Sequence, residues 1–252
     1  MSFTNPLKAA KGTSQILRGA WVAAPSAANA EVVAGIGYDY VCVDMQHGLA
    51  ELSDAVTMFM AIAGQGPTPI ARLVANDPAL IGKVLDAGAL GIVVPLVNTP
   101  EEAAAAVAAT RYPPRGGRSF GPVRAQIATG SKAVADLEEI FVAVMVETAQ
   151  GLERVEEIAA VEGVDAIYCG PADLALAMGI EPAYERPEQE HIDAIERIRK
   201  ACVDNGIIAG VHCADGAMAS RRVAQGFQMT TIMNDLALLR SAGAAELARA
   251  KQ

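Results

Sequence analysis

The sequence predicts a single (β/α)₈ barrel in which residues 1–252 form one domain. A chain of 252 residues is typical of one such barrel, and short apolar, β-rich runs alternate with helical segments about eight times. Strands that are apolar on both faces indicate a parallel sheet covered by helices. An open, doubly wound sheet is the alternative, but no GxGxxG motif follows the first strand.

The predicted strands are runs rich in Val, Ile and other apolar residues. They are Gly19–Ala24, Tyr38–Asp44, Pro69–Val74, Gly91–Val97, Phe141–Glu147, Val164–Cys169, Ile207–Cys213 and Phe227–Met233. Helices are predicted between them and after the last strand. They are Asn29–Gly35, Leu52–Ala63, Pro78–Ala87, Pro100–Thr110, Gly151–Val161, Glu188–Asn205, Gly216–Gln225 and a final segment from Asp235 onward. The connection Arg111–Val134 is far longer than the others and rich in Pro, Gly and Arg, which is typical of a functional loop.

Composition limits the partners. Apolar residues make up 52% of the chain and aromatic residues 4%, so Ala, Val, Ile and Leu are expected to fill the core. The formal charge is −9, and an acidic surface repels phosphate backbones and anionic lipid, so we expect neither nucleic acid nor membrane as a partner. The start of the chain shows no export signal. We therefore expect a cytoplasmic protein whose four cysteines are reduced and structural.

Polar residues at the carboxyl ends of barrel strands are the natural site candidates. The second predicted strand ends in Asp44 and leads to His47, and the third contains Arg72. The fifth ends in Glu147, and Asp173 follows the sixth after the Gly170–Pro171 turn.

Glu147 ends an otherwise apolar run, and a buried carboxylate needs a cation or a strong donor. Asp173 comes from the neighbouring strand. Two carboxylates without Cys or His ligands favour a hard divalent cation that keeps open positions, Mg²⁺ or Mn²⁺, with Co²⁺ as a further candidate. The structural alternative is that Asp173 caps the helix starting at Leu174 and that Glu147 pairs with an arginine.

Histidine is the usual general base near neutral pH. His47 is the candidate because Gly48 follows it at a strand end. His191 is expected on a solvated helix face, and His212 is expected to be a hydrogen-bonded core or rim residue. Arg72 can bind a carboxylate or stabilise an oxyanion, or it can form a structural ion pair with Glu147 or Asp44.

The lysines exclude a second type of carbonyl chemistry. None of the six lies in a predicted strand, so Schiff-base chemistry with an amine has no candidate residue. A barrel that acts on a carbonyl without lysine must stabilise its enolate with a metal. The segment MNDLALLRSAG after the eighth strand also lacks a Gly-rich phosphate-binding loop, which favours a substrate without phosphate.

These residues resemble the HpcH/HpaI family of metal-dependent class II pyruvate aldolases. The segments that carry the resemblance are VDMQHG, RYPPRGGRSFGP, VMVETAQG and YCGPADLALAMG, together with GAWVAAPS near the start and GFQMTTIMNDLALL near the end. They span nearly the whole chain, and their combination is specific. The resemblance implies reversible aldol addition between a 2-oxo acid such as pyruvate or hydroxypyruvate and an aldehyde, in a homo-oligomer that is a hexamer.

The resemblance also implies residue roles. The metal ligands are Glu147 and Asp173, His47 is the base, Arg72 stabilises the enolate, and Asp86 raises the basicity of His47. The implied substrate-binding residues are Trp21, Arg72, Gly170, Pro171, Ala172 and Asp173, with the backbone at Ala172 and Asp173 holding the carboxylate.

Three features depart from this pattern. Gln46 stands where the family usually has Glu, and Met145 where it usually has Gln, which removes a polar contact from the expected substrate pocket. Asp86 is predicted at the end of a helix, at the barrel face opposite His47, so a dyad needs an irregular segment or a neighbouring subunit.

Two other functions remain open from the sequence. A lyase of the citrate lyase β or malyl-CoA type would need a basic patch for CoA, and this acidic chain shows none. A non-catalytic barrel that binds 2-oxo acids would not need acids and bases at four strand ends.

Overall fold

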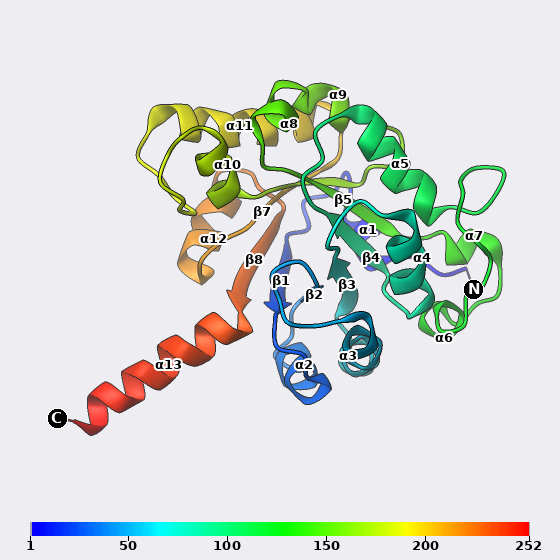
Figure 1. The fold of residues 1–252 in the computed structure, drawn as a ribbon, viewed down its shortest axis with the longest axis horizontal. Helices are drawn as coiled ribbons and strands as arrows, with labels where there is room; N and C mark the ends of the chain where they lie inside the picture. The colour runs from blue at the N-terminus through cyan, green and yellow to red at the C-terminus, as the bar shows by residue number, and fades with distance from the viewer. Residues whose placement is uncertain (1, 252) are drawn as a thin grey trace.

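The computed structural model describes residues 2–251 and shows a closed barrel of eight parallel strands in the order β1 to β8 (Figure 1). The strands are β1 (Leu17–Val22), β2 (Tyr40–Asp44), β3 (Thr68–Arg72), β4 (Gly91–Val94), β5 (Phe141–Val146), β6 (Ala166–Cys169), β7 (Ile208–Val211) and β8 (Met229–Asn234). All eight predicted strands are present, with ends shifted by up to three residues. The doubly wound alternative is wrong, because β1 pairs with both β2 and β8 and closes the sheet.

Thirteen helices lie in the described residues. They are α1 (Pro6–Ala9), α2 (Ala27–Ala34), α3 (Leu52–Gln65), α4 (Pro78–Asp86), α5 (Pro100–Thr110), α6 (Ala125–Thr129), α7 (Val134–Leu137), α8 (Ala149–Glu153), α9 (Val155–Ala159), α10 (Pro171–Ala177), α11 (Gln189–Asp204), α12 (Gly216–Ala224) and α13 (Asp235–Ala250). Side-chain caps define several of their starts: Asp77 before Pro78 and Thr99 before Pro100 each accept a hydrogen bond from a first-turn N–H.

The core has two layers. The layer between strands and helices is almost wholly aliphatic, as the composition predicts. The barrel interior differs, because it holds four aromatic side chains: Trp21, Tyr40, Phe141 and Tyr168. The enclosed volume is small, so these few aromatic residues suffice to fill it. Tyr40 fits there because Gly19 faces it on the neighbouring strand, where a Cβ would lie 2.1 Å from the tyrosine ring.

The long connection 111–134 does not reach the carboxyl ends of the strands. It runs from the end of α5 to α7 and the start of β5, so it lies at the amino ends of the strands. There Arg118 donates a hydrogen bond to Asp86 at the end of α4, at 2.7 Å. The loop is therefore remote from the strand ends at which the polar candidates gather.

The last helix departs from the barrel pattern. Figure 1 shows α13 projecting away from the barrel instead of packing beside the strands. Four of its leucines, Leu236, Leu238, Leu239 and Leu247, are between 39% and 70% exposed. A helix with this many exposed leucines is left without a partner in the single chain.

Among residues 2–251, no helix combines the length and apolar character needed to cross a membrane. That residues 1–252 form one domain stays a prediction, and Met1 and Gln252 lie outside the described residues.

Candidate active site

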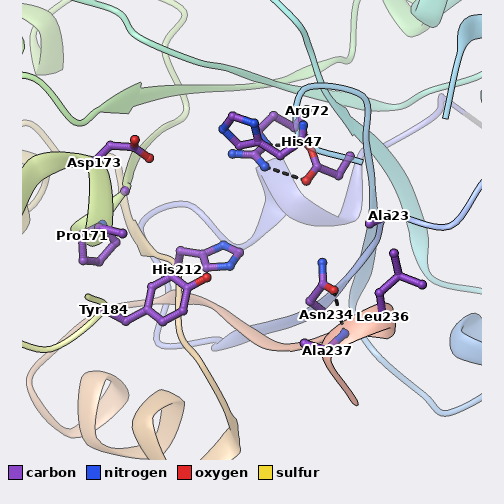
Figure 2. A pocket seen from close by; sticks show the side chains of 13 residues that line it. Ala23, His47, Arg72, Pro171, Asp173, Tyr184, His212, Asn234, Leu236 and Ala237 are labelled. Atoms are coloured by element: carbon purple, nitrogen blue, oxygen red, sulfur yellow. Dashed lines mark hydrogen bonds and ion pairs between the residues drawn. The ribbon is translucent and has the colours of Figure 1, made fainter. Parts of the chain in front are cut away.

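A cavity of about 370 Å³ opens at the carboxyl ends of the strands (Figure 2). Six residues expected at the site from the sequence line it: His47, Arg72, Gly170, Pro171, Ala172 and Asp173. They come from β3 and from the segments that follow β2 and β6. The barrel therefore brings together most of the predicted residues, as strand ends in a closed parallel sheet must.

Arg72 forms a bidentate ion pair with Asp44. Its Nε and Nη2 donate to the two carboxylate oxygens at 2.8 and 2.6 Å, and strand pairing sets Asp44 directly opposite Arg72. The structural alternative of an ion pair with Asp44 is thus present, yet Arg72 also lines the cavity. Its Nη1 has no protein partner in the described part of the chain and can donate to a ligand.

The charge of this pair is well compensated. Burial alone would raise the pKa of Asp44, but the hydrogen bonds and charge of Arg72, with the N–H groups of His47 and Gln46, hold that pKa below its usual value. The two N–H groups donate to the Asp44 carboxylate at 3.2 Å each. Asp44 therefore anchors both the guanidinium and the turn that carries His47. The ion pair was one of the alternatives from the sequence, whereas the contact with the turn was not.

Trp21 does not line the cavity as expected. It is 1% exposed and lies in the barrel interior, with the Arg72 guanidinium carbon 4.6 Å from its ring centroid. A buried indole supports Arg72 by a cation–π contact. A substrate contact at Trp21 stays a prediction.

His47 is an exposed residue at the mouth of the cavity. Gly48 makes its turn possible, because a Cβ there would lie 2.0 Å from the Asp44 carbonyl oxygen. Asp86 does not reach His47 within the chain. It ends α4 at the opposite face of the barrel and pairs with Arg118, so the expected dyad does not form inside one chain, and no irregular segment corrects this.

Glu147 and Asp173 lack the protein partners that would make them merely structural. Glu147 is 3% exposed and accepts one hydrogen bond, from the Leu96 N–H at 2.9 Å, with no ion pair to an arginine in residues 2–251. Helix α10 begins at Pro171 rather than Leu174, and its cap residue is Gly170, so Asp173 is not the cap. Both structural alternatives are therefore wrong.

The electrostatics of the pair fit a cation. Burial raises the pKa of Glu147 to about 7; the Leu96 N–H opposes this rise, and the negative charge of Asp173 adds to it. Gly170 leaves the space that the carboxylate occupies, since a Cβ there would lie 2.3 Å from Glu147 Oε2. Within the described residues no group of three or more His, Cys, Asp or Glu could hold a metal. A divalent cation on these two carboxylates alone would have several positions left for substrate and water.

Leu96 is a further site residue that the sequence did not reveal. It is the one non-glycine residue with positive φ, 54°, in the described chain, and this conformation presents its N–H to Glu147. Asn98 donates to the Leu96 carbonyl at 2.9 Å and supports it. Because the contact is made by backbone, side-chain pattern carries no signal for it.

A family model described as HpcH/HpaI aldolase/citrate lyase matches residues 17–242. The chain belongs to this family. A hydroxypyruvate/pyruvate aldolase from Rhizorhabdus wittichii is 39% identical over 232 residues, 92% of each chain. A 5-keto-4-deoxy-D-glucarate aldolase from Shigella dysenteriae is 34% identical over 249 residues, 95% of this chain and 94% of that protein.

The fold gives the same result. The crystal structure of an HpcH/HpaI aldolase/citrate lyase family protein from Burkholderia cenocepacia superposes with a TM-score of 0.92 at 32% identity, covering 99% of this chain and 100% of that one. The expected family, fold and aldolase type are thus confirmed. With aldolase relatives that match over nine-tenths of its length, the chain is a carbon–carbon lyase.

The departures from the family pattern differ in effect. Met145 is buried in the barrel interior rather than in the cavity wall, and its Cε lies 3.2 Å from where a Cβ on Gly170 would be. Met145 therefore packs beneath the cavity and does not line its wall. The Gln46 side-chain oxygen is buried and has no hydrogen-bond partner.

Of the two other histidines, one departs from its expected place. His191 is fully buried, because it faces α10 from the first turn of α11, and its Nε2 lies 2.8 Å from the Pro171 carbonyl oxygen. The expected solvated position is wrong. His212 lines the cavity together with Tyr184 and Asn234, so the expectation of a rim residue is confirmed, although its neighbours at the site were not foreseen.

Proposed function

We propose that this protein is a divalent-metal-dependent class II aldolase that adds pyruvate or a close analogue, such as hydroxypyruvate, to an aldehyde and catalyses the reverse cleavage. The observation that carries the proposal is the pair Glu147 and Asp173. Asp173 lines the cavity, and Glu147 is buried next to Gly170, which also lines it, with no ion-pair partner in residues 2–251. Among the described residues that line the cavity none is lysine, which agrees with enolate rather than Schiff-base chemistry. The 2-oxo acid is taken from the names of the relatives.

In this proposal the 2-oxo acid binds with its carboxylate on the backbone of Ala172 and Asp173. These residues lie in the first turn of α10, where N–H groups lack intrahelical partners. Bound at Glu147 and Asp173, a divalent cation such as Mg²⁺, Mn²⁺ or Co²⁺ supplies the Lewis acidity that stabilises an enolate.

His47 takes a proton from C3 of the 2-oxo acid, and the Nη1 of Arg72 donates to the enolate oxygen as charge develops there. The enolate carbon then attacks the aldehyde carbon, a carbon–carbon bond forms, and the aldehyde oxygen gains a proton. Cleavage follows the same steps backwards. The ion pair with Asp44 supports the role of Arg72, because it holds the guanidinium in one orientation.

We also propose a cytoplasmic homo-oligomer, a hexamer by the family resemblance. The exposed leucines of α13 support association, since a second copy would cover them. Asp86 could act on His47 only across a subunit interface, because within one chain it pairs with Arg118 at the other barrel face. The four free, buried cysteines are compatible with a reducing compartment.

The proposed function is tested by incubating the metal-free protein with pyruvate or hydroxypyruvate and a set of aldehydes, with and without added Mg²⁺, Mn²⁺ or Co²⁺. The expected result is an aldol product that forms only when metal is present. Absence of product with every pair and every metal, in a protein that still binds pyruvate, would favour a non-catalytic binding barrel instead.

A further inference from the structure

One wall of the cavity carries three uncharged polar side chains that the proposed steps do not use. Tyr184 lies in the loop between α10 and α11, His212 directly follows β7, and Asn234 ends β8. Figure 2 shows them across the cavity from His47 and Arg72.

The His212 ring is held in one orientation. Its centroid lies 4.8 Å from the buried Trp21 ring, edge-on, and 5.3 Å from the Tyr184 ring. Nδ1 lies 3.4 Å from the Thr231 hydroxyl, and Nε2 has no partner in the residues described. Burial, with the nearby Arg72 charge, lowers the pKa of His212 to about 4, so at neutral pH the ring is an uncharged imidazole with one donor and one acceptor.

Asn234 and Tyr184 add further uncharged groups. The Asn234 side-chain oxygen accepts the N–H of Ala237 at 3.2 Å and caps α13, which leaves its amide N–H₂ as a donor toward the cavity. The Tyr184 hydroxyl makes no hydrogen bond to other described residues and can donate and accept. Arg72 is near enough for its charge to act on His212, but this charge is already paired with Asp44.

We propose that Tyr184, His212 and Asn234 form a subsite for the hydroxyl group of an uncharged hydroxyaldehyde, the acceptor in the aldol addition. This inference rests on the proposed aldolase function and specifies its second substrate. A hydroxyl group both donates and accepts, so it matches an imidazole of either tautomer, a phenol and an amide.

The same wall disfavours two other classes of aldehyde. An alkyl aldehyde would leave these polar groups unpaired, and a site built to hydrogen-bond a substrate hydroxyl rejects the analogue that lacks it. A carboxylate-bearing aldehyde would lose hydration against three uncharged side chains. The subsite therefore selects hydroxylated, uncharged acceptors.

The test compares kcat/KM for pyruvate addition to glycolaldehyde, to propanal, in which a methyl group replaces the hydroxyl, and to glyoxylate, which carries a carboxylate. Tyr184→Phe and His212→Leu should each lower the glycolaldehyde-to-propanal ratio by about 2–10-fold, the usual worth of one hydrogen bond. Tyr38→Phe is the matched control, two residues before β2 and outside the cavity, and should leave the ratio at the wild-type value. Asn234 is left intact, because its oxygen caps α13.

Equal losses on glycolaldehyde and propanal in both variants, or a wild-type preference for glyoxylate, would overturn the subsite. Exchange of pyruvate methyl protons with solvent, measured without aldehyde, separates failure of the subsite from failure of the proposed aldolase function. Normal exchange with an unchanged aldehyde ratio overturns the subsite alone. Absence of exchange in the wild-type protein with any divalent metal overturns the proposed function and the subsite together.

Discussion

Asp44→Asn keeps the shape of the side chain but removes the charge that faces Arg72. The two side chains are 4% and 9% exposed, so the guanidinium would remain buried without its counter-ion. An amide can also present only one oxygen, and its N–H₂ would meet a guanidinium donor. The variant therefore breaks a buried pair from one side, which is the costly way to remove it.

The expected loss of stability in Asp44→Asn follows from the contacts between Asp44 and Arg72. Of the two hydrogen bonds at 2.8 and 2.6 Å, one loses its acceptor oxygen and the other loses the negative charge of its acceptor; a hydrogen bond to a charged group is worth about 1.5–3 kcal/mol. Because the guanidinium also stays buried without its counter-ion, the expected cost is about 3–5 kcal/mol, that of breaking a buried ion pair from one side. For a chain of this size about 2–4 °C of melting temperature corresponds to 1 kcal/mol, so the expected loss is about 6–20 °C.

Thermal unfolding followed by circular dichroism checks this value. Asp204→Asn is the matched control, because Asp204 forms an exposed i,i+4 pair with Lys200 that is worth only about 0.3–0.5 kcal/mol. Since the folded pKa of Asp44 is lowered, its contribution to stability is present at neutral pH and is lost only as the pH falls through that pKa. A melting temperature within the range of the control would refute the buried ion pair as the anchor of Arg72.

Three further predictions concern the cavity. His47→Ala should lower turnover by about 10²–10⁴-fold with little loss of metal affinity, and unchanged turnover would mean that another group is the base. Arg72→Lys keeps the charge but loses the planar fork, so turnover and pyruvate methyl exchange should fall together by about 10²–10³-fold; normal exchange with slow aldol addition would move Arg72 to the aldehyde side. Gly170→Ala forces a Cβ to within 2.3 Å of the Glu147 carboxylate and should weaken Mn²⁺ binding, measured by calorimetry, by about 10–100-fold. Gly82→Ala is the control, because Gly82 has open space around it, and should leave Mn²⁺ binding unchanged. Equal Mn²⁺ affinity in the two glycine variants would contradict the ligand role of Glu147.

The strands and half of the site could be predicted because both leave a pattern in the sequence. Apolar β-rich runs mark all eight strands, and charged residues that interrupt or end such runs mark Arg72 and Glu147. The observed strand ends differ from the predicted ends by a few residues, because pairing register, and not composition, decides where the hydrogen-bonded ladder stops.

The remaining features depend on three-dimensional register. The pairing of Asp44 with Arg72 follows from the alignment of β2 with β3, and the contact of Leu96 with Glu147 is made by backbone. The helical character of α13 is visible in the sequence, but its projection away from the barrel is not. The charged neighbours of His191 indicate a solvated helix face, whereas its own position in α11 faces inward.

Exchange of pyruvate methyl protons with solvent, followed by proton NMR, tests the central claim most directly, because it reports enolate formation without any aldehyde. Exchange is expected to stop after metal removal with EDTA and to return with Mg²⁺, Mn²⁺ or Co²⁺, and borohydride treatment with pyruvate is expected to leave no covalent adduct. Exchange that persists in the metal-free protein, together with a borohydride-trapped pyruvate adduct on a lysine, would contradict it.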